Sequence, residues 1–399
     1  MLPAVATCLA GFDEILTLQW GASRTRRPFH LETDSKDVEK NNSSGRECMG
    51  RSETDKCPSR LAPPDATGAT LHGLEPTMTN ELTRRQLLSV GAAASVAALP
   101  NPVLLARAAA PAEMTGRKFY SILSLGRLGF QGSFSESLEL AVKHGFEGLD
   151  PDPNYFASVG DDGLKRLLDD LWAKNLRFGA AGLPVEFRRD EATFNDGLKS
   201  LPAAADILQR AGVWRVSTWV LPCSNDLTYP QNFRQHADRL RQCARILADH
   251  GQKLGLEYVA PRTLLRSQRH PFLHTMSEMK ELIVAIGTNN LGIQLDSWHW
   301  FNAEETDKDL LTLRGSDVLT VDLNDAPIGL SLDECRDDHR ELPAATGVIP
   351  VKDFLGSLVR IDYDGPIQPE PFNAALRAKS LDQACASASA AMKRAFSLL

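Results

Sequence analysis

Short apolar runs alternate with longer amphipathic stretches along this chain from about residue 118 to its end. The short runs have the length of β-strands, and the longer stretches repeat apolar residues at the 3.6-residue spacing of helices. Strands are predicted at eight positions: Phe119–Leu125, Phe146–Asp150, Arg177–Leu183, Trp214–Leu221, Leu254–Val259, Gly292–Asp296, Val318–Leu323 and Pro366–Glu370. Helices are predicted between them, including Ser135–His144, Gly163–Lys174, Asn232–His250, Ser277–Ile286 and Val351–Val359, with a final helix over Ala384–Leu399.

Eight strand–helix units in about 280 residues favour a closed barrel over an open doubly wound sheet. Several predicted helices are followed by a glycine suited to the left-handed position after a helix, as at Gly145, Gly212 and Gly251. No Gly-x-Gly-x-x-Gly sequence follows the first predicted strand, which counts against a dinucleotide-binding fold. The predicted fold is therefore α/β, a (β/α)8 TIM barrel that forms a single domain over residues 111–399.

The front of the chain does not share this pattern. Residues 1–77 contain scattered charges without an amphipathic period, and we expect them to be a disordered gene-model extension. Residues 78–110 then begin with Met78 and carry the pair Arg84-Arg85, an apolar run and a series of small residues. This order is typical of a twin-arginine signal peptide. It predicts translation from Met78, recognition by the twin-arginine (Tat) translocase, and export to the periplasm or the medium.

Composition and charge narrow the range of partners. The apolar run of the signal is broken by Pro100 and Pro102, so no stable membrane insertion is expected after cleavage. The net charge of −7 and the pI near 5.8 count against a general binder of nucleic acid. The exposed helical faces do not indicate an interface, and a homo-oligomer is left open. Four cysteines within the predicted barrel lack the spacing of zinc or redox motifs, so ordinary thiols are expected at Cys223, Cys243, Cys335 and Cys385.

Carboxylates stand at or near the carboxyl ends of several predicted strands, where barrel enzymes carry their chemistry. Asp150 ends the second strand and is a candidate for binding substrate, and strands five to eight contribute Glu257, Asp296, Asp322 and Glu370. These last four charges would repel one another, and a divalent ion would resolve the conflict. Oxygen ligands favour Mn²⁺ or Mg²⁺ over Zn²⁺. For a single one of these residues a helix cap or a salt bridge is the alternative, and Asp325 could be the inward-pointing residue in place of Asp322.

Other side chains near the same strand ends are candidates for binding substrate. His299 follows Asp296 by three residues, and Arg340 lies on the predicted loop after strand seven. Flat apolar faces suited to the C–H face of a sugar are offered by Trp219, Trp298 and Trp300. A loop hydrogen bond for His299, exposure to solvent for Arg340 and core packing for the tryptophans are the alternatives. The loops after strands seven and eight lack a Gly-rich phosphate-binding turn, which favours a non-phosphorylated substrate, although Arg377 leaves a phosphate open.

The segments that carry these residues resemble the xylose isomerase-like barrel superfamily, which holds sugar isomerases and epimerases and also endonuclease IV. The resemblance covers roughly Phe119 to Phe372, and it is carried by Gly145–Asp150, Leu256-Glu257, Leu295–His299, Asn324–Pro327 and Tyr363–Pro366 leading to Glu370. It implies a metal site formed by Glu257, Asp296 and Glu370, with the two glutamates as the acid/base pair and His299 in contact with substrate. The sequence departs from the family at Asp322, where the family often has a histidine, and at Asp150, where it often has a glutamate.

The expected activity is isomerisation or epimerisation of a free sugar or keto-sugar by proton abstraction next to a carbonyl. A dehydratase or lyase acting on a keto-sugar or cyclitol begins with the same step and remains an alternative. A carbohydrate-binding barrel without catalysis is the alternative from another class. DNA repair is disfavoured, because endonuclease IV needs a histidine-rich metal cluster, whereas this chain has nine histidines in all and only His299 at a predicted strand end.

Overall fold

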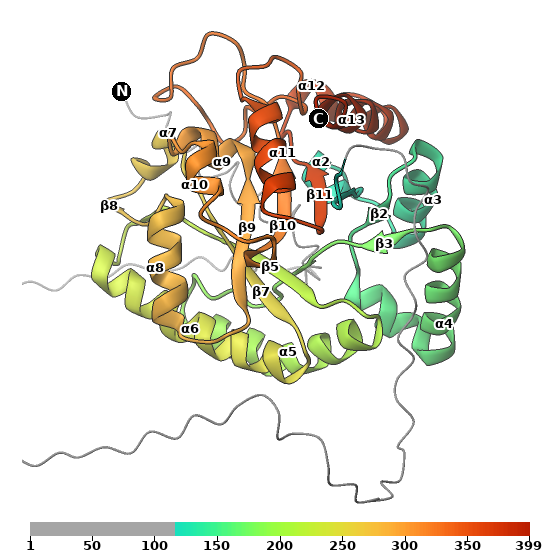
Figure 1. The fold of residues 1–399 in the computed structure, drawn as a ribbon. Helices are drawn as coiled ribbons and strands as arrows, with labels where there is room; N and C mark the ends of the chain where they lie inside the picture. The colour runs from blue at the N-terminus through green and yellow to red at the C-terminus, as the bar shows by residue number, and fades with distance from the viewer. Residues whose placement is uncertain (1–115) are drawn as a thin grey trace, which may run out of the picture. The chain divides into compact units, whose positions relative to one another are not determined.

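Eight parallel strand positions follow one another around the barrel in the computed structural model, which describes residues 116–399 (Figure 1). The strands are β1 (Tyr120–Ser121), β2 (Gly148–Leu149), β3 (Arg177–Phe178) with β4 (Ala181–Gly182), β5 (Arg215–Val220), β7 (Lys253–Tyr258), β9 (Leu291–Asp296), β10 (Val318–Leu323) and β11 (Pro366–Pro369). Two further short strands, β6 (Cys223–Ser224) and β8 (His270–Pro271), pair in antiparallel fashion outside the barrel order.

Backbone pairing joins each barrel strand to its neighbour. One sheet has the order β1-β11-β10-β9-β7-β5-β4, and β2 pairs with β3 beside it. Strands β3 and β4 belong to one extended segment, and Leu123 forms a parallel bridge with Leu149 of β2. These contacts close the ring and confirm the predicted (β/α)8 TIM barrel.

Helices connect the strands and cover the outside of the barrel (Figure 1). The longer helices are α3 (Phe134–His144), α4 (Pro153–Ala173), α5 (Glu191–Arg210), α6 (Tyr229–Asp249), α8 (Met276–Ile286), α11 (Val351–Arg360) and α13 (Leu381–Phe396). Short helical turns follow several strands: α2 (Leu125–Leu128), α7 (Arg262–Leu265), α9 (Ser297–Asn302), α10 (Asp307–Leu310), η1 (Gly315–Asp317) and α12 (Ala374–Arg377). Each predicted strand and helix overlaps an observed element, but some bounds differ. Leu125 begins α2 instead of ending the first strand, and α4 begins at Pro153 and not at the predicted Gly163.

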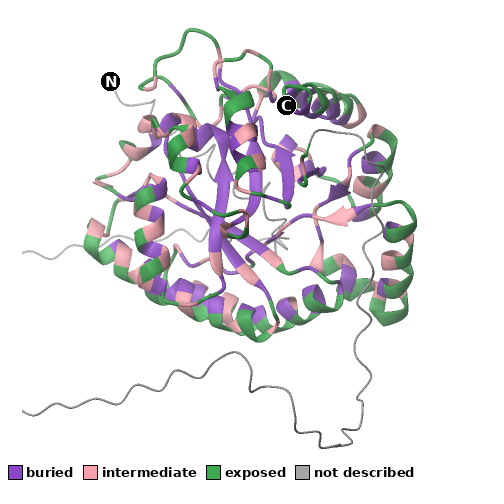
Figure 2. Ribbon diagram, viewed as in Figure 1, coloured by how far each residue is buried: buried purple, intermediate pink, exposed green. Residues whose placement is uncertain are grey.

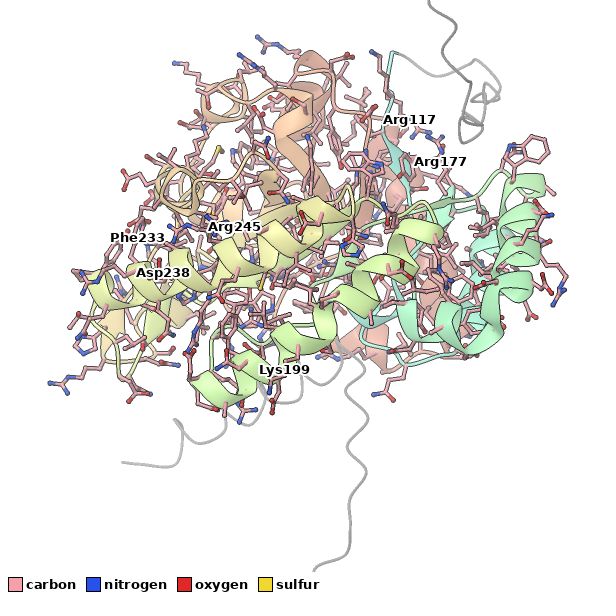
Figure 3. All side chains as sticks on the ribbon, turned by 90° about the horizontal axis from the view of Figure 1, so that it is seen from below. Arg117, Arg177, Lys199, Phe233, Asp238 and Arg245 are labelled. Carbon is pink, nitrogen blue, oxygen red and sulfur yellow. The ribbon has the colours of Figure 1, made fainter. Side chains whose placement is uncertain are left out.

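Burial follows from this layering. The strands β5, β7, β9, β10 and β11 are buried along almost their whole length, whereas β3 is only partly buried and the outer helices are exposed on the side away from the sheet (Figure 2). Seen from below, α5 and α6 lie side by side, with Lys199, Asp238 and Arg245 on these outer helices (Figure 3). Gly148 shows how tightly neighbouring strands approach, because a Cβ atom there would lie 2.2 Å from the carbonyl oxygen of Arg177.

The remaining predictions concern residues 1–110, membrane-spanning helices and the cysteines. The extension and signal predicted over residues 1–110 lie outside the described residues. Within residues 116–399, no helix combines the length and apolar character needed to cross a membrane. The four cysteines of the barrel are buried free thiols, as predicted: Cys223, Cys243, Cys335 and Cys385.

Candidate active site

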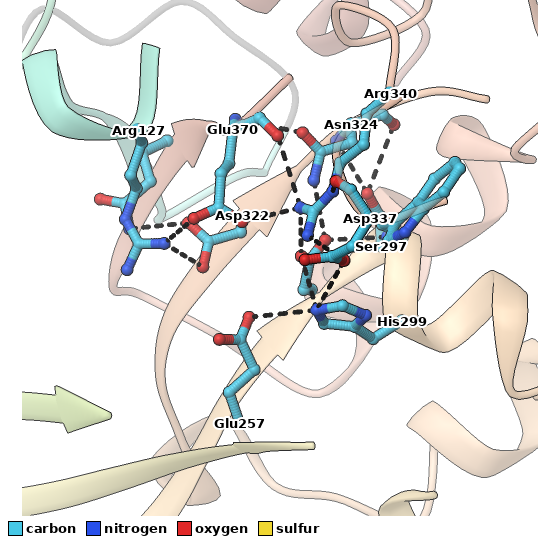
Figure 4. Close-up of polar contacts among 12 residues, drawn as sticks. Arg127, Glu257, Ser297, His299, Asp322, Asn324, Asp337, Arg340 and Glu370 are labelled. Atoms are coloured by element: carbon cyan, nitrogen blue, oxygen red, sulfur yellow. Dashed lines mark hydrogen bonds and ion pairs between the residues drawn. The ribbon is translucent and has the colours of Figure 1, made fainter. Parts of the chain in front are cut away.

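The four carboxylates predicted from strands five to eight meet at the carboxyl ends of the barrel strands. Figure 4 shows Glu257, Asp322 and Glu370 there, and a ligand oxygen of Asp296 lies within 4.8 Å of one of Glu257. Glu257 lies in β7, Asp296 ends β9, Asp322 lies in β10, and Glu370 directly follows β11. Each is at most 4% exposed. Successive side chains of a strand point to opposite faces of the sheet, and side chains two residues apart point to the same face. This alternation explains why these carboxylates point into the barrel.

Asp322, and not Asp325, is the inward-pointing aspartate of β10. Its Oδ1 accepts a hydrogen bond from Nε2 of Gln368, and its Oδ2 accepts one from Nε2 of Gln294, each at 2.8 Å. The carboxylate of Asp325 instead accepts four backbone N–H groups, from Ala326, Thr346, Gly347 and Ile349, at 2.8–2.9 Å. Asp325 therefore organises the long loop after β10.

Arg340 lies inside the site and not in solvent. Its Nη1 is 2.8 Å from Oδ2 of Asp296 and 2.7 Å from Oε2 of Glu370. Its Nη2 donates to Oδ1 of Asp337 at 2.8 Å, and its guanidinium lies over the ring of Phe372. The side chain is 1% exposed. This residue brings a positive charge from the loop after β10 into the centre of the carboxylates.

Arg127 is a second cation in the site, and the sequence analysis did not single it out. It lies in α2, the short helix that follows β1. Its Nη1 lies 3.0 Å from Oδ2 of Asp322 and also pairs with Oε1 of Glu370. Although burial alone would lower its pKa, the surrounding carboxylates raise the pKa of Arg127 above its ordinary value, with Asp322 contributing most. Two guanidinium groups thus compensate the carboxylates.

His299 presents a hydrogen-bond donor to the site. Its Nδ1 accepts a hydrogen bond from the backbone N–H of Ala260 at 3.3 Å, so the neutral ring carries its proton on Nε2. That Nε2 lies 3.5 Å from Oδ2 of Asp296 and 3.9 Å from Oε1 of Glu257. Burial lowers the pKa of His299 to about 3, which keeps the ring neutral at physiological pH.

Glu257 differs from the other three carboxylates. Its Oε1 is buried and has no hydrogen-bond partner among the described residues. Burial, followed by repulsion from Glu370, Asp322 and Asp296, raises its pKa well above the ordinary value of a glutamate. Asp296 and Asp322 have both oxygens engaged by neighbouring groups. Glu257 is consequently the carboxylate best prepared to accept a proton from a bound molecule.

The other predicted binding residues occupy different positions. Asp150 is partly buried after β2, and burial raises its pKa to about 6. Trp298 is fully buried with Arg340 beside its ring, and Trp300 packs against Phe354, so core packing accounts for both. Trp219 belongs to a small apolar cluster with Val259 and Leu264 at the ends of β5 and β7.

A divalent ion was expected here, and the composition of the site is compatible with one. Two groups bring their ligand atoms within 4.8 Å of one another: Glu257, Asp296 and His299, and Glu257, Asp322 and Glu370. However, Arg127 pairs with two members of the second group, Arg340 pairs with Asp296 of the first, and the Nε2 of His299 carries a proton. The donors in this arrangement therefore do not fit an ion, and we route no chemical step through one.

Comparisons with known proteins agree with this fold. The sequence profile of the xylose isomerase-like TIM barrel family matches residues 138–394. Among curated relatives, the 3-dehydroshikimate dehydratase of Pseudomonas aeruginosa is 28% identical over 265 residues, which are 64% of this chain and 38% of the relative. The inosose isomerase of Bacillus velezensis is 22% identical over 251 residues, which are 60% of this chain and 84% of the relative.

Solved structures show the same architecture. A xylose isomerase domain protein from Alicyclobacillus acidocaldarius has a TM-score of 0.60 and 28% identity, with 67% of this chain and 95% of that chain covered. The IOLI protein, solved with a zinc atom, has a TM-score of 0.58 and 19% identity, with 70% and 98% covered. The chain belongs to the xylose isomerase-like TIM barrel family.

Proposed function

We propose that this barrel is an enzyme that moves a proton at the carbon next to a carbonyl group of a small polyhydroxylated molecule, as a sugar isomerase or epimerase. The observation that carries this proposal is Glu257, a buried carboxylate with one unpartnered oxygen and a raised pKa among fixed donors. A general base needs this combination of accessible lone pair and raised proton affinity. The substrate expected is a free sugar, a keto-sugar or a cyclitol ketone.

The proposed step begins with Glu257. An oxygen of its carboxylate takes the proton, the C–H bond breaks, and the electron pair moves onto the carbonyl oxygen to give an enediolate. The Nε2–H of His299 lies near the base, and the guanidinium of Arg340 contacts Asp296, which His299 also approaches. Both groups can donate to the oxygen that gains negative charge. The proton of the adjacent hydroxyl group then moves to the former carbonyl oxygen, and a new C=O bond forms at the carbon that lost its proton. Glu257 returns its proton to the former carbonyl carbon, which completes the isomerisation.

Glu370 was expected to be the second member of an acid/base pair. Both of its oxygens are paired with arginines, Oε1 with Arg127 and Oε2 with Arg340. Proton transfer by Glu370 would therefore have to break a charge-assisted contact. This arrangement favours transfer by Glu257 alone, which isomerisation between adjacent carbons permits, whereas epimerisation needs groups on both faces of the carbon.

A dehydratase is the second candidate function, and the observation in its favour is the 28% identity with the 3-dehydroshikimate dehydratase. Elimination starts with the same abstraction and then expels a β-hydroxyl group. Incubation of the purified chain with free sugars, cyclitol ketones and 3-dehydroshikimate in D₂O, followed by NMR, separates the candidates. An isomerised product labelled with deuterium supports the first, an unsaturated product supports the second, and binding without turnover supports a non-catalytic barrel.

The metal and the location are separate parts of the proposal. The IOLI structure contains zinc. The Mn²⁺ or Mg²⁺ expected from this sequence conflicts with the pairing of Arg127 and Arg340 with the candidate ligands, and metal analysis tests which of the two holds. We also propose export by the twin-arginine route through residues 78–110. A reporter fused to these residues should leave the cytoplasm, and replacement of Arg84 and Arg85 by lysine should retain it there. Export of the double variant at the normal level would contradict this route.

A further inference from the structure

We propose that Arg127 and Arg340 supply the positive charge that a bound divalent ion would otherwise supply, and that Asp322 is the positioning residue for Arg127. The site would then work without a metal ion. The catalytic part of this inference rests on the proposed function, whereas its metal-binding part can be tested without any substrate.

Arg127 contacts carboxylates that could otherwise bind an ion. Within the group Glu257, Asp322 and Glu370, the Nη1 atom of Arg127 contacts one oxygen of Asp322 and one oxygen of Glu370. An ion bound by the same oxygens would have to share this position with a guanidinium. Two cations in contact in a buried site repel each other strongly. Arg127 and a metal ion at this group are therefore mutually exclusive.

The other group of candidate ligands consists of Glu257, Asp296 and His299. Asp296 directs one oxygen to the backbone N–H of Trp298 and the Nδ2 of Asn324, and the other oxygen to Arg340. His299 directs a proton, and not a lone pair, toward Asp296 and Glu257. Of this group, only Glu257 has a carboxylate that accepts no hydrogen bond from a described residue. A single free carboxylate does not by itself hold a divalent ion.

Asp322 stands where the family often has a histidine. An aspartate used as a metal ligand would present an oxygen to the ion. Here Gln368 binds one oxygen, and Gln294 together with Arg127 binds the other. The two glutamines come from the neighbouring strands β9 and β11 and fix the carboxylate plane. Asp322 is thus oriented as the counter-ion of Arg127.

The backbone of Arg127 is held by the short helix α2. The N-terminus of α2 is capped by Ser124, whose Oγ accepts the backbone N–H of Arg127. The helix ends at Gly129, which has a left-handed φ of 84°. A guanidinium fixed at both ends of its side chain is preorganised, and its remaining N–H groups can face an enediolate oxygen.

Metal binding is the direct test. The full chain is freed of metal with a chelator and titrated with Mn²⁺ by electron paramagnetic resonance, and its metal content as purified is measured by mass spectrometry. We expect a metal content well below one equivalent, no saturable Mn²⁺ binding, and proton exchange that a chelator leaves unchanged. Stoichiometric metal that is lost in Glu257→Gln would overturn the inference.

Variants test the same inference in the opposite direction, through a gain of Mn²⁺ binding. The double variant Arg127→Met/Asp322→His removes the guanidinium and restores the imidazole that is frequent in the family, so it should show the saturable, stoichiometric Mn²⁺ binding that wild type lacks. Arg336→Met is the matched control, because it removes an arginine of the loop after β10 that pairs with Asp338 in an exposed contact. It should leave Mn²⁺ binding unchanged.

The folding of the variants and their catalytic activity are measured separately. If the double variant fails to unfold cooperatively on heating, Arg127→Met alone replaces it, and a gain in Mn²⁺ affinity is again expected. Equal Mn²⁺ affinity in wild type and a folded variant contradicts the inference. Absence of proton exchange with every substrate, with and without Mn²⁺, contradicts the proposed function and leaves the result on metal binding standing.

Discussion

The Nε2 atom of His299 lies 3.9 Å from Oε1 of Glu257, the buried carboxylate oxygen without a hydrogen-bond partner. Because the backbone N–H of Ala260 binds Nδ1, the histidine directs its N–H toward the carboxylates. A proton acceptor and a proton donor therefore share one small volume at the carboxyl ends of the strands. This pairing is suited to removing a proton from a carbon while a neighbouring oxygen gains charge.

Replacement of Glu257 by glutamine should make the protein more stable in alkaline solution. Burial raises the pKa of Glu257 in the folded state above its unfolded value, so its favourable contribution is complete below the unfolded pKa and is lost as pH rises through the folded pKa. At pH 9 the free energy of unfolding of Glu257→Gln should exceed that of wild type by about 1–3 kcal/mol, the usual cost of a buried unpaired polar group.

Urea unfolding at pH 5 and pH 9 measures this difference, which should be smaller at pH 5. Glu334→Gln is the control, because that glutamate caps a turn on an exposed part of the loop after β10. A glutamine variant at position 257 that is less stable than wild type at pH 9 would show that the carboxylate is paired.

The pH dependence of the rate should come from Glu257 and not from His299. Since burial lowers the pKa of His299 to about 3, its ring stays neutral across the working range. The rate should increase with pH as Glu257 loses its proton, without a step near the ordinary histidine pKa of about 6.5. Steady-state rates between pH 5 and pH 9 measure this profile.

His299→Leu should lower kcat by about 100-fold through loss of the Nε2–H donor, and His299→Gln should retain part of the rate. Neither change should move the acidic limb of the profile. A limb near pH 6.5 that disappears in His299→Leu would instead identify the histidine as the titrating base.

Arg340 should be the most important single side chain for the stability of the site. Its removal leaves Asp296, Asp337 and Glu370 with reduced compensation in a buried region. Arg340→Met should lower the free energy of unfolding by about 3–5 kcal/mol, as for other broken buried ion pairs. Adding Asp337→Asn should recover part of the loss. Chemical denaturation of both variants checks this, and full additivity of the two changes would count against direct coupling.

Much of this arrangement follows from patterns that are visible in the sequence. Strand and helix periods differ, so all eight strand positions of the closed barrel could be predicted from apolar runs. A carboxylate within or directly after an apolar strand has few structural explanations, and Glu257 and Asp322 were found in this way. The barrel then brings them together, because parallel strands end at one rim.

The compensating charges could not be predicted in the same way. Arg127 lies in a stretch that was expected to follow a strand running through Leu125, and its carboxylate partner Glu370 is 243 residues away in sequence. Arg340 comes from a long loop, where no period shows which side chains turn inward. Gln294 and Gln368 did give a signal, since each is a polar residue within an apolar strand.

Asp325 should control the order of the loop between Ala326 and Pro350. Its carboxylate accepts four backbone N–H groups, which would be left without partners in Asp325→Ala. We expect a loss of about 2–4 kcal/mol in stability and faster amide hydrogen exchange in this loop. Asp333→Ala is the control, because exposed ion pairs such as those of Asp333 with Arg262 and Arg266 contribute little to stability. Unchanged exchange in Asp325→Ala would contradict this role.

Exchange of the substrate proton with solvent tests the central claim most directly. The wild-type chain and Glu257→Gln are incubated with the same sugar or cyclitol ketone in D₂O, and deuterium at the carbon next to the carbonyl is followed by NMR. The account predicts incorporation by wild type and a rate about 10²–10⁴-fold lower in Glu257→Gln, with both proteins folded. Equal incorporation by the two proteins would contradict the assignment of Glu257 as the base.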